Sequence, residues 1–369
     1  MKFRTNKAAF AAAVAAVRHA IGKGAVVDHV LIAVDGAAVR LVATNYELSI
    51  LARIDDADCV TSGAWAVPGD ALQKIVARID DAAVVTIAGA DGRVTMEFGR
   101  SRFELYSIDG GEFPEVAVTV DNAWLWPSTA LLAALRHAHC PSQDDGRPAI
   151  TGILLECDSD ELAVVATDGY RVGLWRAPAA EFEAPRLSAI VHRQALGAIA
   201  APADAAELVQ VGMSGRNATF AAGLVTVQSR LVEAKFPDYR KILPSRDRQP
   251  HRLTLARAGL LAAVARVATM VERATAALPM RLEIEPLSDV LKLSATHSVF
   301  GTASTEIEIA NWPMGIHVSL GVNPSYLTQA LQALTDEHAI LSFGDSMTPI
   351  SVTGDNEPNA VQLIMPMKL

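Results

Sequence analysis

The sequence has few of the residues that build a disulfide framework, a metal site or a membrane span. Its 369 residues include three cysteines, Cys59, Cys140 and Cys157, without the CxxC spacing of a zinc or redox motif. An odd number of unspaced cysteines argues against a disulfide scaffold and predicts a reducing compartment. No stretch reaches the roughly 18 apolar residues of a membrane span, and the start, MKFRTNKAAF, lacks the apolar core of a signal peptide. We therefore expect a cytoplasmic protein that does not enter a membrane.

Aromatic residues and positive charge are also scarce. Aromatics make up 5% of the chain and hydrophobic residues 51%, so the core must consist mainly of Ala, Val, Leu and Ile. The net charge is −9. A protein that grips DNA phosphates usually has a basic total, because Lys and Arg displace the counterions of DNA. The charge argues against a tight reader of DNA sequence. It is compatible with a protein that only surrounds DNA and has a locally positive inner wall.

The sequence also lacks the common catalytic motifs. It has no GxSxG, no HExxH, no glycine-rich phosphate loop and no repeated metal-ligand spacing. Asp168 has histidines and tyrosines elsewhere in the chain as possible partners, but a single Asp beside Gly is usually a turn former. We predict no catalytic residue, no metal site and no cofactor. An enzyme remains the main alternative from another functional class.

The chain is long enough for two or three domains, and it contains a threefold internal repeat. Each copy begins with an Ala-rich pattern of helical period. The apolar positions of this pattern are Phe10, Val14, Val17 and Ile21 in the first copy, Leu131, Leu135 and Ala138 in the second, and Leu260, Val264, Val267 and Val271 in the third. This spacing predicts one amphipathic helix near the start of each copy.

Two further patterns recur in each copy. A strand that ends in a small turn reads RLVATNYEL, AVVATDGYRV and LKLSATHSVF, with Thr44, Thr167 and Thr296 at the same point, 123 and 129 residues apart. A second helix follows in WAVPGDALQKIVARI, AIVHRQALGAIAA and LGVNPSYLTQALQAL. Each copy is predicted to be an α+β unit of two helices and about eight strands in antiparallel sheets. The expected repeats are residues 1–121, 122–247 and 248–369.

The repeat leaves two arrangements open. Three tandem domains could follow one another without closing. Repeats of this length are too long for a solenoid, however, and similar copies joined by short linkers tend to close by symmetry. The repeat pattern therefore favours a ring.

Four strings resemble the bacterial DNA polymerase III beta subunit, the beta sliding clamp. They are the opening MKF, ATDGYR at 166–171, KFPDYRKILP at 235–244 and the terminal MPMKL at 365–369. The resemblance spans the whole chain. It implies a non-catalytic processivity factor whose head-to-tail homodimer closes a ring of six repeats around double-stranded DNA. It also implies that DNA polymerases and the clamp loader are partners.

The resemblance implies a hydrophobic groove that binds short peptide motifs of these partners. The corresponding positions are Arg147, Ile150, Thr167, Gly169, Tyr170, Arg171, Val172, Pro237, Lys241, Ile242, Asn323, Tyr326, Met347, Pro349, Leu363, Ile364, Met365, Pro366, Met367, Lys368 and Leu369. Tyr170 replaces a frequent His of the family, and Lys241 replaces a frequent Arg. A specialised clamp paralogue with an altered pocket is therefore a second alternative.

Two more sets of residues follow from the resemblance. Lys74 and Arg78 lie away from the apolar stripe of their helix, which suits either an ordinary solvated face or a DNA-facing wall. The full DNA-facing set is Lys23, Lys74, Arg78, His137, Arg193, Arg266 and Arg273. The implied subunit interface contains Phe103, Leu105, Thr269, Met270, Glu306 and Glu308.

Overall fold

The computed structural model divides the chain into two compact units, and each is described by itself. Unit 1 consists of Met1–Leu132, Phe182–Pro185 and Val191–Val232, and unit 2 of Ala133–Glu181, Arg186–Ile190 and Glu233–Leu369. The residues that the structure describes are 1–80, 83–118, 120, 123–144, 146–271, 278–286, 288–309, 312, 316–357 and 359–369. Within these ranges, no helix combines the length and the apolar character that crossing a membrane requires.

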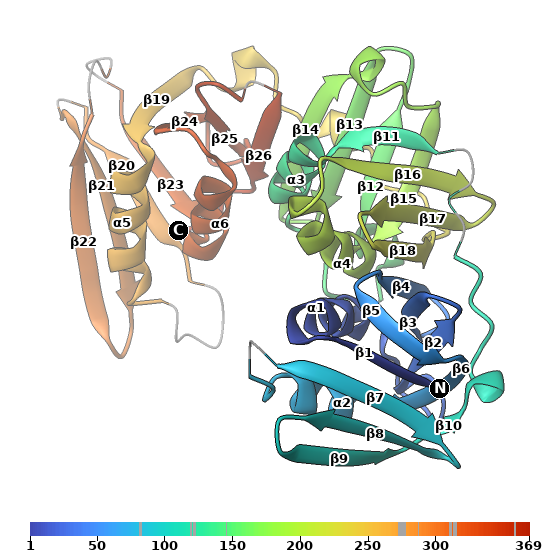
Figure 1. The fold of residues 1–369 in the computed structure, drawn as a ribbon. Coiled ribbons are helices and arrows are strands. Elements are labelled where there is room, and N and C mark those ends of the chain that lie inside the picture. Colours follow the sequence, from blue (N-terminus) through green and yellow to red (C-terminus); the bar gives the residue numbers. More distant parts are fainter. Residues whose placement is uncertain are drawn as a thin grey trace. The chain divides into compact units, whose positions relative to one another are not determined.

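In the part of the chain that the structure describes, two α-helices fall in each predicted repeat, and Figure 1 labels them. They are α1 (Lys7–Val17), α2 (Gly69–Val76), α3 (Ser128–His137), α4 (Arg193–Asp204), α5 (Arg257–Ala268) and α6 (Pro324–Ala333). Asn6 starts α1 because its side chain accepts a hydrogen bond from the amide of Ala9. Asn323 does the same for the amide of Ser325 at α6, where Pro324 occupies the first helical position. The predicted first and second helices of each copy are therefore present.

Unit 1 contains a nine-stranded and a five-stranded antiparallel sheet. The order of the larger sheet is β10 (Ile108–Asp109), β6 (Gly63–Pro68), β2 (His29–Asp35), β3 (Ala38–Thr44), β4 (Leu48–Ile54), β18 (Val225–Arg230), β17 (Asn217–Ala222), β16 (Leu208–Ser214) and β11 (Trp124–Pro127). The order of the smaller one is β5 (Ala57–Thr61), β1 (Lys2–Asn6), β7 (Val84–Ala90), β8 (Arg93–Phe98) and β9 (Ser101–Tyr106). Phe3, Phe10 and Ile87 are fully buried in the core of this unit.

Unit 2 contains an eight-stranded and a four-stranded sheet. The order of the larger sheet is β15 (Leu187–His192), β12 (Gly152–Cys157), β13 (Glu161–Thr167), β14 (Arg171–Pro178), β26 (Ala360–Ile364), β25 (Ile350–Gly354), β24 (His338–Phe343) and β19 (His251–Ala256). The order of the smaller one is β22 (Gly301–Glu308), β21 (Val290–His297), β20 (Met280–Ile284) and β23 (Val318–Val322). One apolar core joins the strands of the smaller sheet to α5 and α6, through Leu260, Leu282 and Leu327 among others.

Each of the two larger sheets is shared by neighbouring repeats. In the nine-stranded sheet, β4 of the first repeat pairs with β18 of the second, with Ile50 opposite Val227. In the eight-stranded sheet, β14 of the second repeat pairs with β26 of the third, with Gly173 opposite Gln362. Both pairings are antiparallel, so backbone hydrogen bonds run across each boundary between repeats. The chain thus has the three-repeat fold that the sequence predicts, while the proposed repeat boundaries stay a prediction.

Gly173 is predicted to be required where β14 passes under the end of α3. A Cβ atom at Gly173 would lie 2.1 Å from the carbonyl oxygen of His137, which is backbone and cannot move aside cheaply. We expect Gly173→Ala to lower the free energy of unfolding by about 1–3 kcal/mol, as overpacking does. Chemical denaturation measures the change.

The matched control is Gly259→Ala in the first turn of α5. There the new Cβ would meet only Ala256 Cβ, at an ordinary 4.0 Å. This variant should gain roughly 0.5–1 kcal/mol from the lower backbone entropy of alanine. Equal effects of the two substitutions would contradict the packing argument.

Candidate functional site

A cavity of about 340 Å³ opens in unit 2 where the second and third repeats meet. Its walls come from the loop before β12, the turn between β13 and β14, the segment that follows β18, and the end of β26. The lining residues are Arg147, Ala149, Ile150, Thr167, Gly169, Tyr170, Arg171, Val172, Pro237, Tyr239, Ile242, Leu363 and Met365. Apolar walls with a few polar groups are typical of a site that binds an apolar side chain and fixes its direction.

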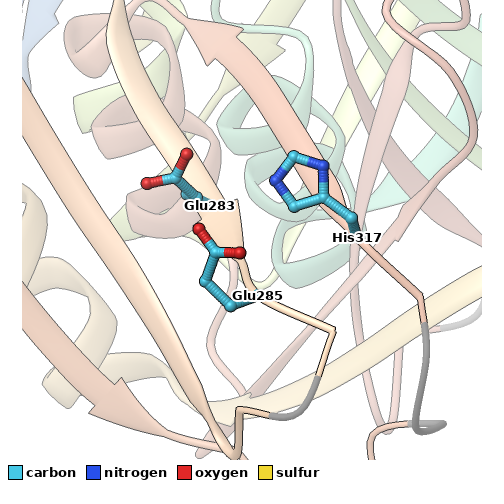
Figure 2. Close-up of side chains that lie close together, drawn as sticks. All are labelled: Glu283, Glu285 and His317. Atoms are coloured by element: carbon cyan, nitrogen blue, oxygen red, sulfur yellow. The ribbon is translucent and has the colours of Figure 1, made fainter.

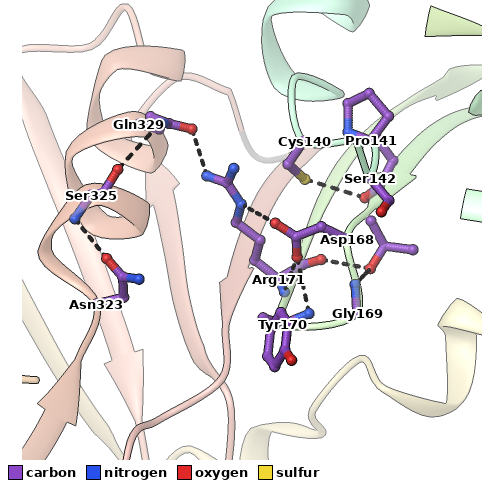
Figure 3. Close-up of polar contacts among 12 residues, drawn as sticks. Cys140, Pro141, Ser142, Asp168, Gly169, Tyr170, Arg171, Asn323, Ser325 and Gln329 are labelled. Carbon is purple, nitrogen blue, oxygen red and sulfur yellow. Dashed lines mark hydrogen bonds and ion pairs between the residues drawn. The ribbon is translucent and has the colours of Figure 1, made fainter. Parts of the chain in front are cut away.

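The turn from Asp168 to Arg171 forms one wall and is held by its own side chains. Asp168 Oδ1 accepts hydrogen bonds from the amides of Tyr170 and Arg171 at 2.9 and 3.1 Å (Figure 3). The Thr167 hydroxyl donates to the carbonyl of Arg171 at 2.7 Å. Gly169 has φ +92°, which favours glycine at this point. Asp168 is therefore a turn former, which is the simpler interpretation that the sequence offers for this residue.

Arg171 ties this turn to α6. Its guanidinium pairs with Asp168 Oδ2 at 2.9 Å, lies 4.3 Å from the ring centre of Tyr326, and donates to Gln329 Oε1 at 2.6 Å. Burial, with the nearby Asp168 carboxylate, raises the pKa of Tyr326, so its hydroxyl remains neutral. These three contacts fix the position of the guanidinium beside the cavity.

The segment after β18 forms the opposite wall. Tyr239 is buried, and its hydroxyl donates to Glu156 Oε2 at 3.0 Å. Burial and the Glu156 carboxylate raise the pKa of Tyr239, so the phenol stays a hydrogen-bond donor. Arg240 donates to the same carboxylate oxygen at 2.5 Å. These bonds fasten the segment to β12 and leave Ile242 39% exposed at the mouth of the cavity.

The C-terminal residues complete the site by backbone pairing. The amide of Met365 donates to the carbonyl of Tyr170 at 2.9 Å, and the amide of Met367 donates to that of Gly321 at 2.8 Å. A Cβ at Gly321 would lie 2.4 Å from the Met367 carbonyl oxygen, so the tail requires glycine on β23. Met365 and Leu369 remain partly exposed. Methionine adapts its shape easily, which suits a site for several different ligands.

The structure brings most of the predicted pocket residues to this cavity or beside it. Those that line it are Arg147, Ile150, Thr167, Gly169, Tyr170, Arg171, Val172, Pro237, Ile242, Leu363 and Met365. Those that do not line it are Lys241, Asn323, Tyr326, Met347, Pro349, Ile364, Pro366, Met367, Lys368 and Leu369. Sequence reasoning missed Ala149 and Tyr239; Tyr239 lies within the informative string KFPDYRKILP, whereas Ala149 carries no signal except its neighbour Ile150. The binding role of the whole set stays a prediction.

The predicted DNA-facing residues differ in their surroundings. Lys23, Lys74, Arg78 and Arg266 are exposed, and Arg266 donates to Thr305 Oγ1 at 3.4 Å. Arg193 is half-buried at the start of α4. The prediction for Arg273 lies outside the described residues. Exposure is required for DNA contact but does not establish it.

The prediction that His137 faces DNA is wrong. Its side chain is fully buried at the end of α3, with Nε2 2.7 Å from Glu357 Oε2. The amide nitrogen of Gln362 donates to the carbonyl of His137 at 3.0 Å. Arg136 also pairs with Glu357, at 2.9 Å. The third repeat therefore covers the last turn of α3, and the imidazole of His137 is shielded from solvent.

The predicted interface residues lie at two sheet edges and one helix end. Phe103 and Leu105 are on β9, where Phe103 is 38% exposed and stacks on Phe98 with ring centres 5.6 Å apart. The exposed residues Glu306 and Glu308 are on β22. At the end of α5, Thr269 is exposed and Met270 packs partly buried against the core of unit 2. Their role as an interface stays a prediction.

One group of possible metal ligands occurs among the described residues. Glu283, Glu285 and His317 offer ligand atoms within 4.8 Å of one another at the ends of β20 and β23 (Figure 2). Glu285 and His317 are exposed, and Arg281 lies 3.5 Å from Glu283 Oε1 and supplies a positive charge of its own. Solvation of Glu285 and His317, together with the ion pair of Arg281 with Glu283, explains how these side chains lie close together without a metal ion.

Sequence models of one family match nearly the whole chain. They are described as the N-terminal, central and C-terminal domains of the DNA polymerase III beta subunit, and they match residues 1–117, 134–238 and 240–368.

Individual relatives agree with this family. The beta sliding clamp of Pseudomonas putida is 26% identical over 348 residues, which cover 93% of this chain and 92% of the relative. That of Escherichia coli K12 is 26% identical over 355 residues, with the same coverage. The solved clamp of C. crescentus has a TM-score of 0.88 at 24% identity, over 100% of this chain and 99% of that one. A griselimycin-bound clamp from Pseudomonas aeruginosa has a TM-score of 0.88 at 24% identity, over the whole of both chains.

The buried histidine predicts a pH dependence of stability. Burial holds the pKa of His137 below its ordinary value, against the opposing effect of Glu357. A histidine whose pKa is lower in the folded state stabilises the fold above its unfolded pKa of about 6.5, and this contribution is lost as the pH falls towards the folded pKa. We expect stability to decrease between pH 7.5 and 5.5, and His137→Gln to make the decrease shallower. Urea denaturation at each pH measures both slopes.

Part of the slope should survive in this variant. Burial, together with the charge of Arg171, also lowers the pKa of His139. Glu357 adds a separate loss of stability at lower pH. Burial acts to raise the pKa of its carboxyl group, but hydrogen bonds from Thr335 and His137 leave that pKa lowered. The matched control is His338→Gln, because the His338 side chain is 45% exposed. A slope changed as much by that variant as by His137→Gln would contradict the assignment.

Proposed function

Because the chain belongs to the DNA polymerase III beta subunit family, the sliding clamps, we propose that two copies close head to tail around duplex DNA and hold polymerases and the clamp loader at the cavity of unit 2. Proteins of this family are processivity factors without catalytic activity of their own. The observation that supports a closed ring is that each unit contains one sheet whose edge strand lacks the neighbouring strand that its counterparts in the other repeats have.

The two larger sheets show how neighbouring repeats join. In the nine-stranded sheet, five strands of the first repeat continue into four of the second, through β4–β18. In the eight-stranded sheet, four strands of the second repeat continue into four of the third, through β14–β26. The sheet β5-β1-β7-β8-β9 stops at β9, the counterpart of β18 and β26. The sheet β22-β21-β20-β23 starts at β22, the counterpart of β4 and β14. Pairing β9 of one copy with β22 of another would complete both sheets.

Physical chemistry favours that closure. A long exposed edge strand offers unpaired backbone groups and tends to pair with another chain. All residues of β9 except Leu105 are exposed, including Phe103 and Tyr106. A head-to-tail contact uses two different surfaces and gives a closed ring when its rotation permits. Two copies with three repeats each would give six repeats.

The charge of the chain fits topological binding better than tight gripping of DNA. The net charge is −9, yet four basic side chains are exposed: Lys74 on α2, Arg78 just after it, Arg266 on α5 and Lys23 in the loop between α1 and β2. A few cations that contact phosphates hold DNA weakly and in a salt-dependent manner. A ring with such a lining would slide along the duplex. It would be retained by closure and not by affinity.

Retention on circular DNA is the first test of this proposal. We expect the protein, loaded by a clamp loader on a nicked circular plasmid, to remain on the circle through gel filtration at moderate salt. Linearising the plasmid should release most of it, because an open end removes only the topological barrier. The amount bound before and after cleavage is the measurement.

A substitution at the proposed seam supplies the matched control. Phe103→Asp places a charge on β9 and should prevent both dimer formation and retention, while binding of a partner peptide to unit 2 stays unchanged. Retention that linearisation does not alter would mean ordinary DNA binding and would remove the ring from the proposal.

The apolar mouth of the cavity predicts peptide binding. Ile242 and Met365 line it and are 39% and 38% exposed, so shortening them should cost the fold little. We expect Ile242→Ala and Met365→Ala each to weaken binding of a leucine- and phenylalanine-containing clamp-binding peptide roughly tenfold, which corresponds to about 1.4 kcal/mol of lost apolar contact. Fluorescence anisotropy of the labelled peptide measures the dissociation constant.

Val60→Ala is the control, since Val60 is an exposed apolar residue on β5 that does not line the cavity. Unchanged affinity in the two pocket variants would place the peptide site elsewhere.

A further inference from the structure

The segment that joins the second and third repeats is strongly basic, although the chain as a whole is acidic. Residues 235–252 contain six basic and two acidic side chains, whereas the whole chain has a net charge of −9. All six basic residues are exposed: Lys235, Arg240, Lys241, Arg246, Arg248 and Arg252. A run of charges is usually an ordinary solvated face. This basic segment differs from such a face in its fixed backbone and in its position beside the cavity.

The backbone of the basic segment is held against the eight-stranded sheet. Gln249 Nε2 donates to the carbonyl of Pro349 and to Ser351 Oγ, both at 2.7 Å. A Cβ atom at Gly344 would lie 2.1 Å from the carbonyl oxygen of Arg248, so the two stretches of backbone are in close contact. A partner that binds here would therefore order little additional backbone, which lowers the entropic cost of binding.

A row of opposed residues leads from the cavity across the sheet to the basic segment. Leu363 of β26 lines the cavity and lies opposite Ser351 of β25. Ser351 lies opposite Ser342 of β24, which in turn lies opposite Arg252 of β19. Directly opposed residues share one face of a sheet. Because neighbouring strands are about 4.8 Å apart, Arg252 lies roughly 14 Å from Leu363, a distance that about four residues of extended chain span.

Several cations of the basic segment are available to a ligand. Two of the six are already paired within the chain, Arg240 with Glu156 at 2.5 Å and Lys241 with Asp238 at 3.0 Å. Among the residues that the structure describes, no ion pair involves the side chains of Lys235, Arg246 and Arg252. An acidic ligand could pair with these cations without breaking an existing ion pair.

We propose that the basic segment binds acidic residues that flank the apolar anchors of a partner peptide held in the cavity. This inference rests on the proposed peptide binding and adds a charge requirement to it. The cavity, of about 340 Å³, is at the small end of the range for ligand sites and accommodates only a few side chains. The rest of a bound peptide must lie on the surface outside. Carboxylates about four to six residues from the anchors would reach the basic segment, and complementary charge would also speed association.

The side of the sheet on which the basic segment lies favours a protein partner over DNA. Side chains of successive strand residues point to opposite faces. Leu253, the residue after Arg252, packs in one apolar core with Leu260 of α5. The basic segment therefore lies on the face of the sheet opposite to α5. Arg266, which is predicted to face DNA, is exposed on that helix and lies on the other side.

Peptides that differ only in their flanks test the charge requirement. The probes are one leucine- and phenylalanine-containing clamp-binding peptide with neutral flanks, and two versions with three aspartates four to six residues before or after the anchors. We expect one of the two acidic peptides to bind about tenfold more tightly than the neutral one at about 50 mM salt. The gain should fall to about twofold or less at about 500 mM, because salt screens exposed ion pairs. Fluorescence anisotropy measures each dissociation constant.

A double variant assigns the gain to the basic segment. Arg246→Gln with Arg252→Gln should remove most of the gain and leave the affinity for the neutral peptide unchanged. The matched control is Arg4→Gln with Arg40→Gln, which removes the same charge from exposed positions of unit 1 and should keep the gain. A gain that persists in the first variant, or that is lost equally in the control, overturns the proposal.

The remaining outcomes separate this inference from the peptide site itself. Equal affinities of the three peptides overturn the charge requirement, and they leave the cavity proposal standing if Ile242→Ala weakens binding of the neutral peptide. Absence of binding by all three peptides overturns both. A linear DNA duplex that binds more weakly to Arg246→Gln with Arg252→Gln, when acidic flanks give no gain, would assign the basic segment to DNA and overturn its proposed role in peptide binding.

Discussion

Antiparallel pairing of β14 with β26 carries backbone hydrogen bonds from the second repeat into the third, and the cavity of unit 2 depends on it. The pairing sets Val172 opposite Leu363 and leads the chain on to Met365, whose amide bonds to Tyr170. Val172 and Leu363 both line the cavity. A displacement of β26 by one residue would turn its side chains to the other face of the sheet and remove this wall. The register of one strand pair thus determines the shape of the site.

A second layer of contacts fixes the same junction through polar groups, of which His137 and Gln362 are buried. Glu357 accepts hydrogen bonds from Arg136 and Thr335 and lies beside Nε2 of His137. Gln362 on β26 also bonds to the carbonyl of His137. Because a buried polar group that loses its partner is costly, these bonds favour one position of α3 against β26. The backbone ladder and this network therefore both hold β26 in the position that forms a wall of the cavity.

The internal junctions and the unpaired edges of the chain follow from one repeated building rule. Each repeat provides one strand that pairs forward and one that pairs backward, and a chain of three repeats satisfies two such pairings within itself. The strands left over are β9 and β22. Their backbone groups are hydrogen-bonded on one side only, a state that proteins normally avoid or cover. In the proposed assembly, these two edge strands are the ones that would pair between copies of the chain.

Apolar periodicity located the helices, because a side chain's face on a helix follows from its position in the sequence, and together with the recurring threonine strings it located the threefold repeat. The informative strings ATDGYR, KFPDYRKILP and MPMKL marked three of the cavity walls before any contact was known. Periodicity could not decide what covers a helix at its end: His137 lies off the apolar stripe, yet the third repeat buries it. Nor could it reveal that Tyr239 bonds to Glu156, 83 residues away. The sequence determined the local elements and their family, whereas burial and partners were decided by which distant strands pair, because contacts of that range depend on the packing of the whole unit.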